Sequence, residues 1–169
     1  FHAVEDPEAR AEASYLHDDA ARLLDDLHER DVPMGIVTHC AEFLARPVAN
    51  RLGLTGRFDT FLSCSDETGW KPAPDPIRIA MDDIGVDPTS QRGVYLGDGD
   101  GDVGAAWNAG LDAVHVERHG HEQRGRCVRA DHRVWSFDEL PRTGVGDAAW
   151  EPGLGSARVD GSGLDGDVT

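Results

Sequence analysis

The sequence predicts an α/β fold in which a parallel sheet is covered by helices on both faces. Short apolar runs of three to five residues alternate along the chain with longer segments whose apolar residues recur every three or four positions. Such alternation is typical of β-α-β units, whose parallel strands are buried on both faces. The length of 169 residues suits one domain of this kind.

The first half of the chain predicts a helix, a strand, a helix and a strand. Apolar residues recur at helical spacing over 16–27, and the apolar run 33–37 follows turn-forming residues. A second helical stretch covers 41–52, and we expect Pro47 to interrupt it because an interior proline lacks the N–H that a helix uses. The apolar run 61–64 is the next predicted strand.

The second half begins with the clearest helix, over 75–84. Asp75 is the expected N-cap and Pro76 follows it in the first helical position, where a missing N–H costs nothing. A shorter helix over 103–109 is expected to end at Gly110. The remaining predicted strands cover 94–96, 113–116 and 133–135.

The composition excludes several classes of function. Thirty-two acidic residues against sixteen basic ones give a net charge of −16, which disfavours binding to nucleic acids and to anionic membrane surfaces. No stretch is apolar enough to span a bilayer, and no secretory signal pattern is present, so we expect a cytoplasmic protein. Its 22 Asp and 15 Arg, against 10 Glu and one Lys, resemble the proteins of salt-loving archaea. This predicts halophilic behaviour.

Polar residues follow three of the predicted strands. Thr38 and His39 follow the first strand, Lys71 lies in the loop after the second, and Asp98 and Asp102 follow the third. In an open parallel sheet, ligands bind at the carboxyl ends of the strands. A hydroxyl, an ammonium and carboxylates suit phosphoryl chemistry, which needs a hydrogen-bond donor, a cation for the phosphoryl oxygens and ligands for Mg²⁺.

The segments that carry these residues resemble the motifs of a known family. IVT (36–38), KPAPDP (71–76) and VYLGDGDGDVGAAWNAG (94–110) resemble, in this order, motifs II, III and IV of the haloacid dehalogenase (HAD) superfamily, most closely its phosphoglycolate-phosphatase-like members. The resemblance implies a three-layer, Rossmann-like core. It also implies a hydrolase, a Mg²⁺-dependent phosphatase that acts on a small phosphorylated metabolite through an aspartyl-phosphate.

The resemblance assigns roles to the same residues. Thr38 would hold the transferring phosphoryl group through its hydroxyl, and Lys71 would neutralise charge on that group and on the nucleophile. Asp98 and Asp102 would hold Mg²⁺ directly or through water. His39 stands where Asn often follows the Thr, so it is expected to contact the substrate.

One departure from the family pattern is large. The family's nucleophile is an aspartate of a D-x-D sequence that follows an apolar strand near the amino terminus, and no such sequence precedes 33–37. We therefore expect the first strand, the nucleophile and most of the helical cap to be missing, and this chain alone to be inactive. The expected parts are the end of the cap over 1–19, the core over 20–142 and a Gly- and Asp-rich disordered tail over 143–169.

Other interpretations of the same residues stay open. Thr38 is also a suitable N-cap for the helix that follows, and Lys71 could be a solvated loop cation. The acidic run 98–102 resembles a calcium loop, although Val103 and Ala109 occupy the positions of its turn glycine and bidentate glutamate. The alternative functions are a receiver-like phosphoacceptor signalling domain and a non-catalytic remnant that binds a partner.

Overall fold

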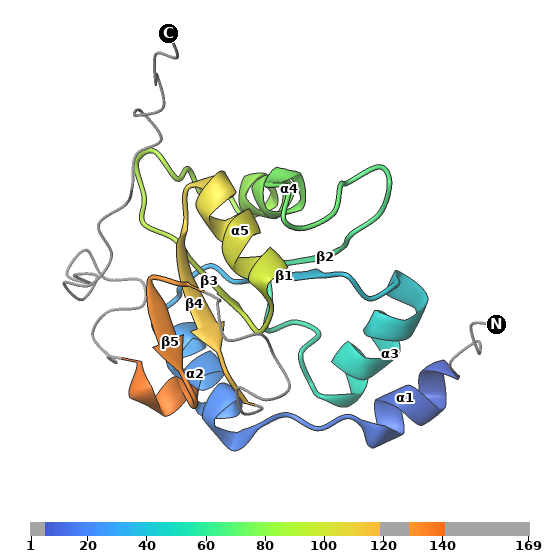
Figure 1. Ribbon diagram of the computed structural model, residues 1–169. Helices are drawn as coiled ribbons and strands as arrows, with labels where there is room; N and C mark the ends of the chain where they lie inside the picture. The colour runs from blue at the N-terminus through green and yellow to red at the C-terminus, as the bar shows by residue number, and fades with distance from the viewer. Residues whose placement is uncertain (1–5, 119–128, 141–169) are drawn as a thin grey trace, which may run out of the picture.

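The computed structural model describes residues 6–118 and 129–140, and Figure 1 shows their arrangement. The tail predicted over 143–169 lies outside these described residues. The elements, in chain order, are α1 (Pro7–Ala13), α2 (Asp18–Glu29), β1 (Gly35–Thr38), α3 (Glu42–Arg51), β2 (Thr60–Ser63), α4 (Asp75–Asp83), β3 (Val94–Gly97), α5 (Asp100–Ala109), β4 (Asp112–Val116), β5 (His132–Val134) and the 3-10 turn η1 (Phe137–Glu139). The predicted α/β class is confirmed.

All strand pairs among the described residues are parallel, as the sequence predicts, but they form two sheets. β1 pairs with β2, with Thr38 opposite Ser63 at their carboxyl ends. The other sheet has the order β3-β4-β5. The two sheets meet where the Tyr95 hydroxyl of β3 donates to the Val37 carbonyl of β1 at 3.0 Å. The carboxyl ends of β1 and β3 therefore lie at one edge of the fold.

Helices cover both faces of the sheets. Residues of β4 alternate between two hydrophobic cores, with Ala113 in one and Val114 in the other. The core on the Ala113 face contains residues of α4 and α5, namely Ile77, Met81, Val103, Ala105, Ala106 and Ala109. The core on the Val114 face contains Leu27 of α2 together with Met34, Val116, Val134 and Leu140. Figure 1 shows the same order, with α4 and α5 on one side of the strands and α2 on the other.

The helix over 41–52 is α3, and the expected interruption at Pro47 is wrong. The helix runs without a break from Glu42 to Arg51 with Pro47 inside it. Pro47 cannot donate to the carbonyl of Phe43, four residues earlier. The helix tolerates the missing hydrogen bond on a side of α3 where Phe43 is 60% exposed.

Two expected helix ends can be compared with the structure. Gly110 ends α5 with φ of 88°, a left-handed conformation that favours glycine, so this prediction is confirmed. Asp75 is the first residue of α4 and Pro74 is its cap, without a side-chain cap hydrogen bond. The prediction of Asp75 as N-cap is therefore wrong by one residue.

Two short elements are not predicted by the sequence patterns. α1 packs against α3, and η1 contacts α2 through Asp19, whose carboxylate accepts hydrogen bonds from Ser136 Oγ at 2.9 Å and Phe137 N at 2.8 Å. Both elements are too short for an apolar period to identify them. Within the described ranges, no helix has the length and apolar character that a membrane crossing requires.

Candidate active site

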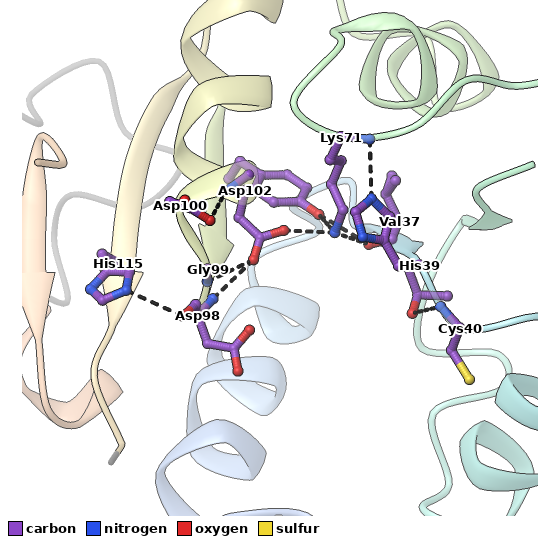
Figure 2. Close-up of polar contacts among 12 residues, drawn as sticks. Val37, His39, Cys40, Lys71, Asp98, Gly99, Asp100, Asp102 and His115 are labelled. Carbon is purple, nitrogen blue, oxygen red and sulfur yellow. Dashed lines mark hydrogen bonds and ion pairs between the residues drawn. The ribbon is translucent and has the colours of Figure 1, made fainter. Parts of the chain in front are cut away.

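The predicted site residues line one cavity at the carboxyl ends of β1 and β3. The cavity has a volume of about 570 Å³. Three segments form it: the end of β1 with the residues that follow it, the loop between β2 and α4, and residues 98–102, which include the turn after β3 and the start of α5. Its lining consists of Thr38, His39, Cys40, Lys71, Pro72 and the turn 98–102. Figure 2 shows the polar contacts that join these segments.

Lys71 is the centre of these contacts. Its ammonium lies 2.6 Å from Asp102 Oδ1, 3.1 Å from the Tyr95 hydroxyl and 3.3 Å from the Val37 carbonyl. An ammonium has three N–H donors, so each can serve one of these acceptors. The side chain is 9% exposed, so the interpretation of Lys71 as a solvated loop cation is wrong.

The surroundings of Lys71 keep it charged. Burial disfavours the ammonium, but Tyr95 and Asp102 outweigh that cost and raise the pKa of Lys71 above its usual value. Burial has the opposite effect on a phenol and raises the pKa of Tyr95, while the adjacent ammonium opposes that shift. Lys71 is therefore a permanent cation at neutral pH, as neutralisation of an anion requires.

Asp102 holds the turn between β3 and α5. Its Oδ1 accepts from Lys71, and its Oδ2 accepts the backbone N–H groups of Asp98 at 3.1 Å and Gly99 at 2.9 Å. A Cβ atom at Gly97 would lie 2.4 Å from Cβ of Asp102, so this close approach requires glycine at residue 97. Both oxygens of Asp102 thus face protein donors, so this residue, which the sequence predicts to be a metal ligand, has a structural role.

Thr38 and His39 occupy the end of β1 at the cavity. The N-cap of α3 is Ala41, so the interpretation of Thr38 as a helix cap is wrong. Thr38 Oγ1 accepts the N–H of Cys40 at 3.0 Å. His39 Nε2 accepts the backbone N–H of Lys71 at 3.1 Å, which joins the segment after β1 to the loop that carries the lysine. The neutral His39 ring consequently has its proton on Nδ1.

Asp98 and Asp100 lie on the exposed side of the turn. Asp98 is exposed, and its backbone carbonyl accepts from His115 Nε2 at 3.2 Å. Asp100 is the first residue of α5, and its Oδ1 accepts the N–H of Gly101 at 2.8 Å. Since 100–109 is helical, the acidic run cannot form a calcium loop, whose ligands come from a non-helical turn.

Carboxylate oxygens are suitable ligands for a hard cation such as Mg²⁺, but the described residues offer too few of them here to hold the ion alone. Mg²⁺ prefers oxygen ligands and retains several waters. Asp98 is exposed, and Asp102 accepts hydrogen bonds from three protein donors. Across residues 6–118 and 129–140, no group of three or more His, Cys, Asp or Glu side chains could hold a metal ion. A metal bound here would need further oxygen ligands from water, the substrate or another carboxylate.

Tyr95 and Cys64 are two further neighbours of Lys71. Tyr95 lies in β3, where an aromatic residue looks like ordinary core, and only its hydroxyl contacts reveal its role. Cys64 follows β2 and is 4% exposed, and burial raises the pKa of its thiol. A protonated, buried thiol is a poor nucleophile, so Cys64 is a packing residue.

A family model and several known proteins match this chain. Residues 2–116 match the family model of haloacid dehalogenase-like hydrolases. Phosphoglycolate phosphatase of Escherichia coli (strain K12) is 28% identical over 107 residues, 63% of this chain and 42% of that protein. Phosphoglycolate phosphatase of Xylella fastidiosa (strain 9a5c) is 37% identical over 97 residues, 57% of this chain and 42% of that protein.

A solved structure shares the fold. The crystal structure of a HAD phosphatase from Thermococcus onnurineus superposes with a TM-score of 0.64 at 28% identity, over 74% of this chain and 56% of that one. The chain spans 42% of the length of both curated phosphatases. The family model spans all of the residues that line the cavity.

Proposed function

Because the chain belongs to the family of haloacid dehalogenase-like hydrolases, we propose that its cavity serves a Mg²⁺-dependent phosphatase that hydrolyses a small phosphate monoester. One observation carries this proposal, the convergence of Thr38, Lys71 and Asp98 on one cavity from three separate segments. Together they offer a hydroxyl, a permanent cation and an exposed carboxylate. The two phosphoglycolate phosphatases that resemble the chain support the same reaction class.

Each residue has a role in binding the phosphoryl group. The Thr38 hydroxyl donates to one phosphoryl oxygen, and the Lys71 ammonium neutralises the charge on the others. To do so, Lys71 exchanges its longest contact, the 3.3 Å one to the Val37 carbonyl, for a phosphoryl oxygen. The protonated Nδ1 of His39 is a further donor at the same edge of the cavity.

The nucleophile of the proposed reaction is an aspartate. Its carboxylate attacks phosphorus, the bond between phosphorus and the ester oxygen breaks, and the alcohol leaves with that electron pair and takes up a proton. Water then attacks the aspartyl-phosphate, which releases phosphate and restores the carboxylate. The described elements that precede β1 are the helices α1 and α2, so no aspartate there follows a strand.

The arrangement of the two sheets supports a position for this aspartate. Among the described strands, β1 pairs only with β2, and β3 pairs only with β4. The Val37 carbonyl of β1 accepts side-chain donors from Tyr95 and Lys71. A further strand between β1 and β3 would join the sheets and end beside Thr38 and Lys71. The nucleophile thus comes from a segment outside the described residues.

Mg²⁺ would be held by the carboxylate of Asp98, with Asp102 acting through water. The bound ion would supply charge neutralisation at the phosphoryl oxygens. Asp102 keeps its contact to Lys71 in this arrangement and so couples the cation of the loop to the turn that carries Asp98.

A second candidate is a non-catalytic chain that binds a partner through this cavity. The observation that favours it is the closed set of contacts at Lys71, whose three donors all have protein acceptors. The two candidates differ in whether Lys71 exchanges a contact for phosphate.

The single lysine makes this difference measurable. In protein labelled with ¹³C-lysine, the only signal belongs to Lys71, and it is expected to shift when phosphate is added with Mg²⁺. Arg46→Met, which removes an exposed cation of α3, should leave that shift unchanged. If the chemical shift of the lysine signal does not change when phosphate is added, the result would contradict the phosphatase proposal and favour the partner-binding candidate.

Turnover tests the source of the nucleophile separately. The 169-residue chain is expected to release no phosphate from p-nitrophenyl phosphate with Mg²⁺. Turnover that survives rigorous purification would place the nucleophile within this chain and contradict only the expectation that the chain alone is inactive.

A further inference from the structure

His115 is a buried polar residue in an otherwise apolar strand. It lies in β4 between Val114 and Val116 and is 1% exposed. Its Nε2 lies 3.2 Å from the backbone carbonyl oxygen of Asp98. Figure 2 shows this contact as a dashed line between the two residues. A carbonyl oxygen only accepts hydrogen bonds, so Nε2 must carry the proton and donate.

The other ring nitrogen of His115, Nδ1, makes a histidine at this position unfavourable for stability. Nδ1 is buried and has no hydrogen-bond partner among the residues that the structure describes. A buried polar atom without a hydrogen-bond partner destabilises the folded protein. An apolar side chain would suit the strand better, so packing alone does not account for a histidine here.

The carbonyl that His115 contacts belongs to the residue proposed to bind Mg²⁺. The backbone of the turn is held from two sides. Asp102 accepts the N–H groups of Asp98 and Gly99, and His115 donates to the carbonyl between them. These contacts together fix the peptide plane from which the exposed Asp98 side chain extends.

We propose that His115 is a positioning residue, which holds the Asp98–Gly99 peptide so that the Asp98 carboxylate faces the cavity. The contact between His115 and the Asp98 carbonyl is part of the structure. Its role in metal binding rests on the proposed function. His115 itself stays beneath the turn and does not contact the phosphoryl group.

Nitrogen NMR of the metal-free protein tests the contact itself. The imidazole nitrogen signals are expected to show a proton on Nε2. A hydrogen bond to a carbonyl polarises the peptide, so His115→Leu should shift the amide nitrogen signal of Gly99. His115→Gln keeps a donor at a similar reach and should restore most of that signal. A proton on Nδ1, or a Gly99 signal that His115→Leu leaves unchanged, would overturn the inference.

Metal binding tests the purpose of the contact. His115→Leu is expected to weaken binding of Mn²⁺, a paramagnetic substitute for Mg²⁺, by about tenfold, and His115→Gln should recover most of the loss. Val114→Ala is the matched control, because Val114 is also 1% exposed in β4 and faces the opposite core. Equal weakening by Val114→Ala and His115→Leu would reduce His115 to a packing role and overturn the inference.

The two measurements separate this inference from the proposed function. If the wild-type chain binds no Mn²⁺ while the Gly99 signal responds to His115→Leu as expected, the metal part of the proposed function fails and the positioning contact stands. If Mn²⁺ binds and the Gly99 signal does not respond, the proposed metal site stands and the inference about His115 fails.

Discussion

Lys71 Nζ and Asp102 Oδ1 lie 2.6 Å apart, and their side chains are only 9% and 13% exposed. The two residues are 31 positions apart, one in the loop before α4 and the other in the first turn of α5. Two opposite charges removed from water depend on each other, because either one alone would be a buried, unpaired ion. This pair joins the second and third segments of the cavity.

Removing the lysine is expected to destabilise the fold. Lys71→Met leaves the Asp102 carboxylate buried without its ammonium, so the free energy of unfolding should fall by about 3 kcal/mol. Urea unfolding measures this loss. Arg46→Met is the control, since its ion pair with Glu42 is exposed and should contribute at most about 0.5 kcal/mol. The double variant Lys71→Met/Asp102→Asn should recover part of the loss, and a failure to recover any would contradict the dependence of the two charges.

The pKa of Lys71 can be followed without interference, because it is the only lysine. Titration of the ¹³C-lysine signal is expected to give a pKa above the usual value, since Tyr95 and Asp102 raise it. Tyr95→Phe removes the hydroxyl contact and should bring the pKa down. Tyr15→Phe changes the other tyrosine, which is 70% exposed, and should have no effect. Identical titrations of Tyr95→Phe and the wild type would remove Tyr95 from the site.

Asp19 is expected to make stability depend on pH in the acid range. Burial raises its pKa, but hydrogen bonds from Arg118, Phe137 and Ser136 outweigh burial, so the pKa lies well below the usual value. A depressed folded-state pKa stabilises the protein above the unfolded-state pKa of about 3.9, and that stability is lost as the pH falls through the folded-state value.

Asp19→Asn should therefore cost about 2 kcal/mol at neutral pH, and its difference from the wild type should shrink as the pH falls below about 4. Urea unfolding at a series of pH values measures that difference. Asp25→Asn is the control, because Asp25 is 58% exposed in its pair with Arg57. A difference for Asp19→Asn that stays constant down to about pH 2 would show that ionisation of Asp19 is irrelevant to stability.

Salt is expected to stabilise the fold. The net charge is −16, so the acidic side chains repel one another in the compact folded state, and added salt screens that repulsion. The melting temperature should rise by several degrees, on the order of 5–10 °C, between low salt and molar KCl. Sucrose, which favours compact states without screening charge, is the control. Equal melting temperatures at low and high KCl would contradict the prediction of halophilic behaviour.

The sequence patterns predict the elements of the fold well and some of their details poorly. The runs 33–37 and 61–64 correspond to β1 and β2 within two residues, because burial on both faces leaves a continuous apolar run. The interruption expected at Pro47 is wrong, since α3 tolerates the missing hydrogen bond on an exposed side of the helix. The separation of the strands into two sheets also lies outside any local pattern.

The candidate site shows the same division. Thr38, Lys71, Asp98 and Asp102 can be found from their order along the chain, and the structure brings them to one cavity. The contacts of Tyr95 and His115 cannot be found in this way. In the sequence each is an ordinary strand residue, and only the folded structure shows that its polar atom contacts another segment.

The sequence by itself determined the α/β class, the order of the three motifs and the acidic surface, because hydrophobic period, spacing and charge are properties of neighbouring residues. Only the tertiary structure decided that Lys71 shares its three donors among Asp102, Tyr95 and Val37, and that a buried histidine holds the carbonyl of Asp98. The physical reason is range. A hydrogen bond depends on positions to within a few tenths of an ångström, and these positions are set by segments that meet only when the chain is folded.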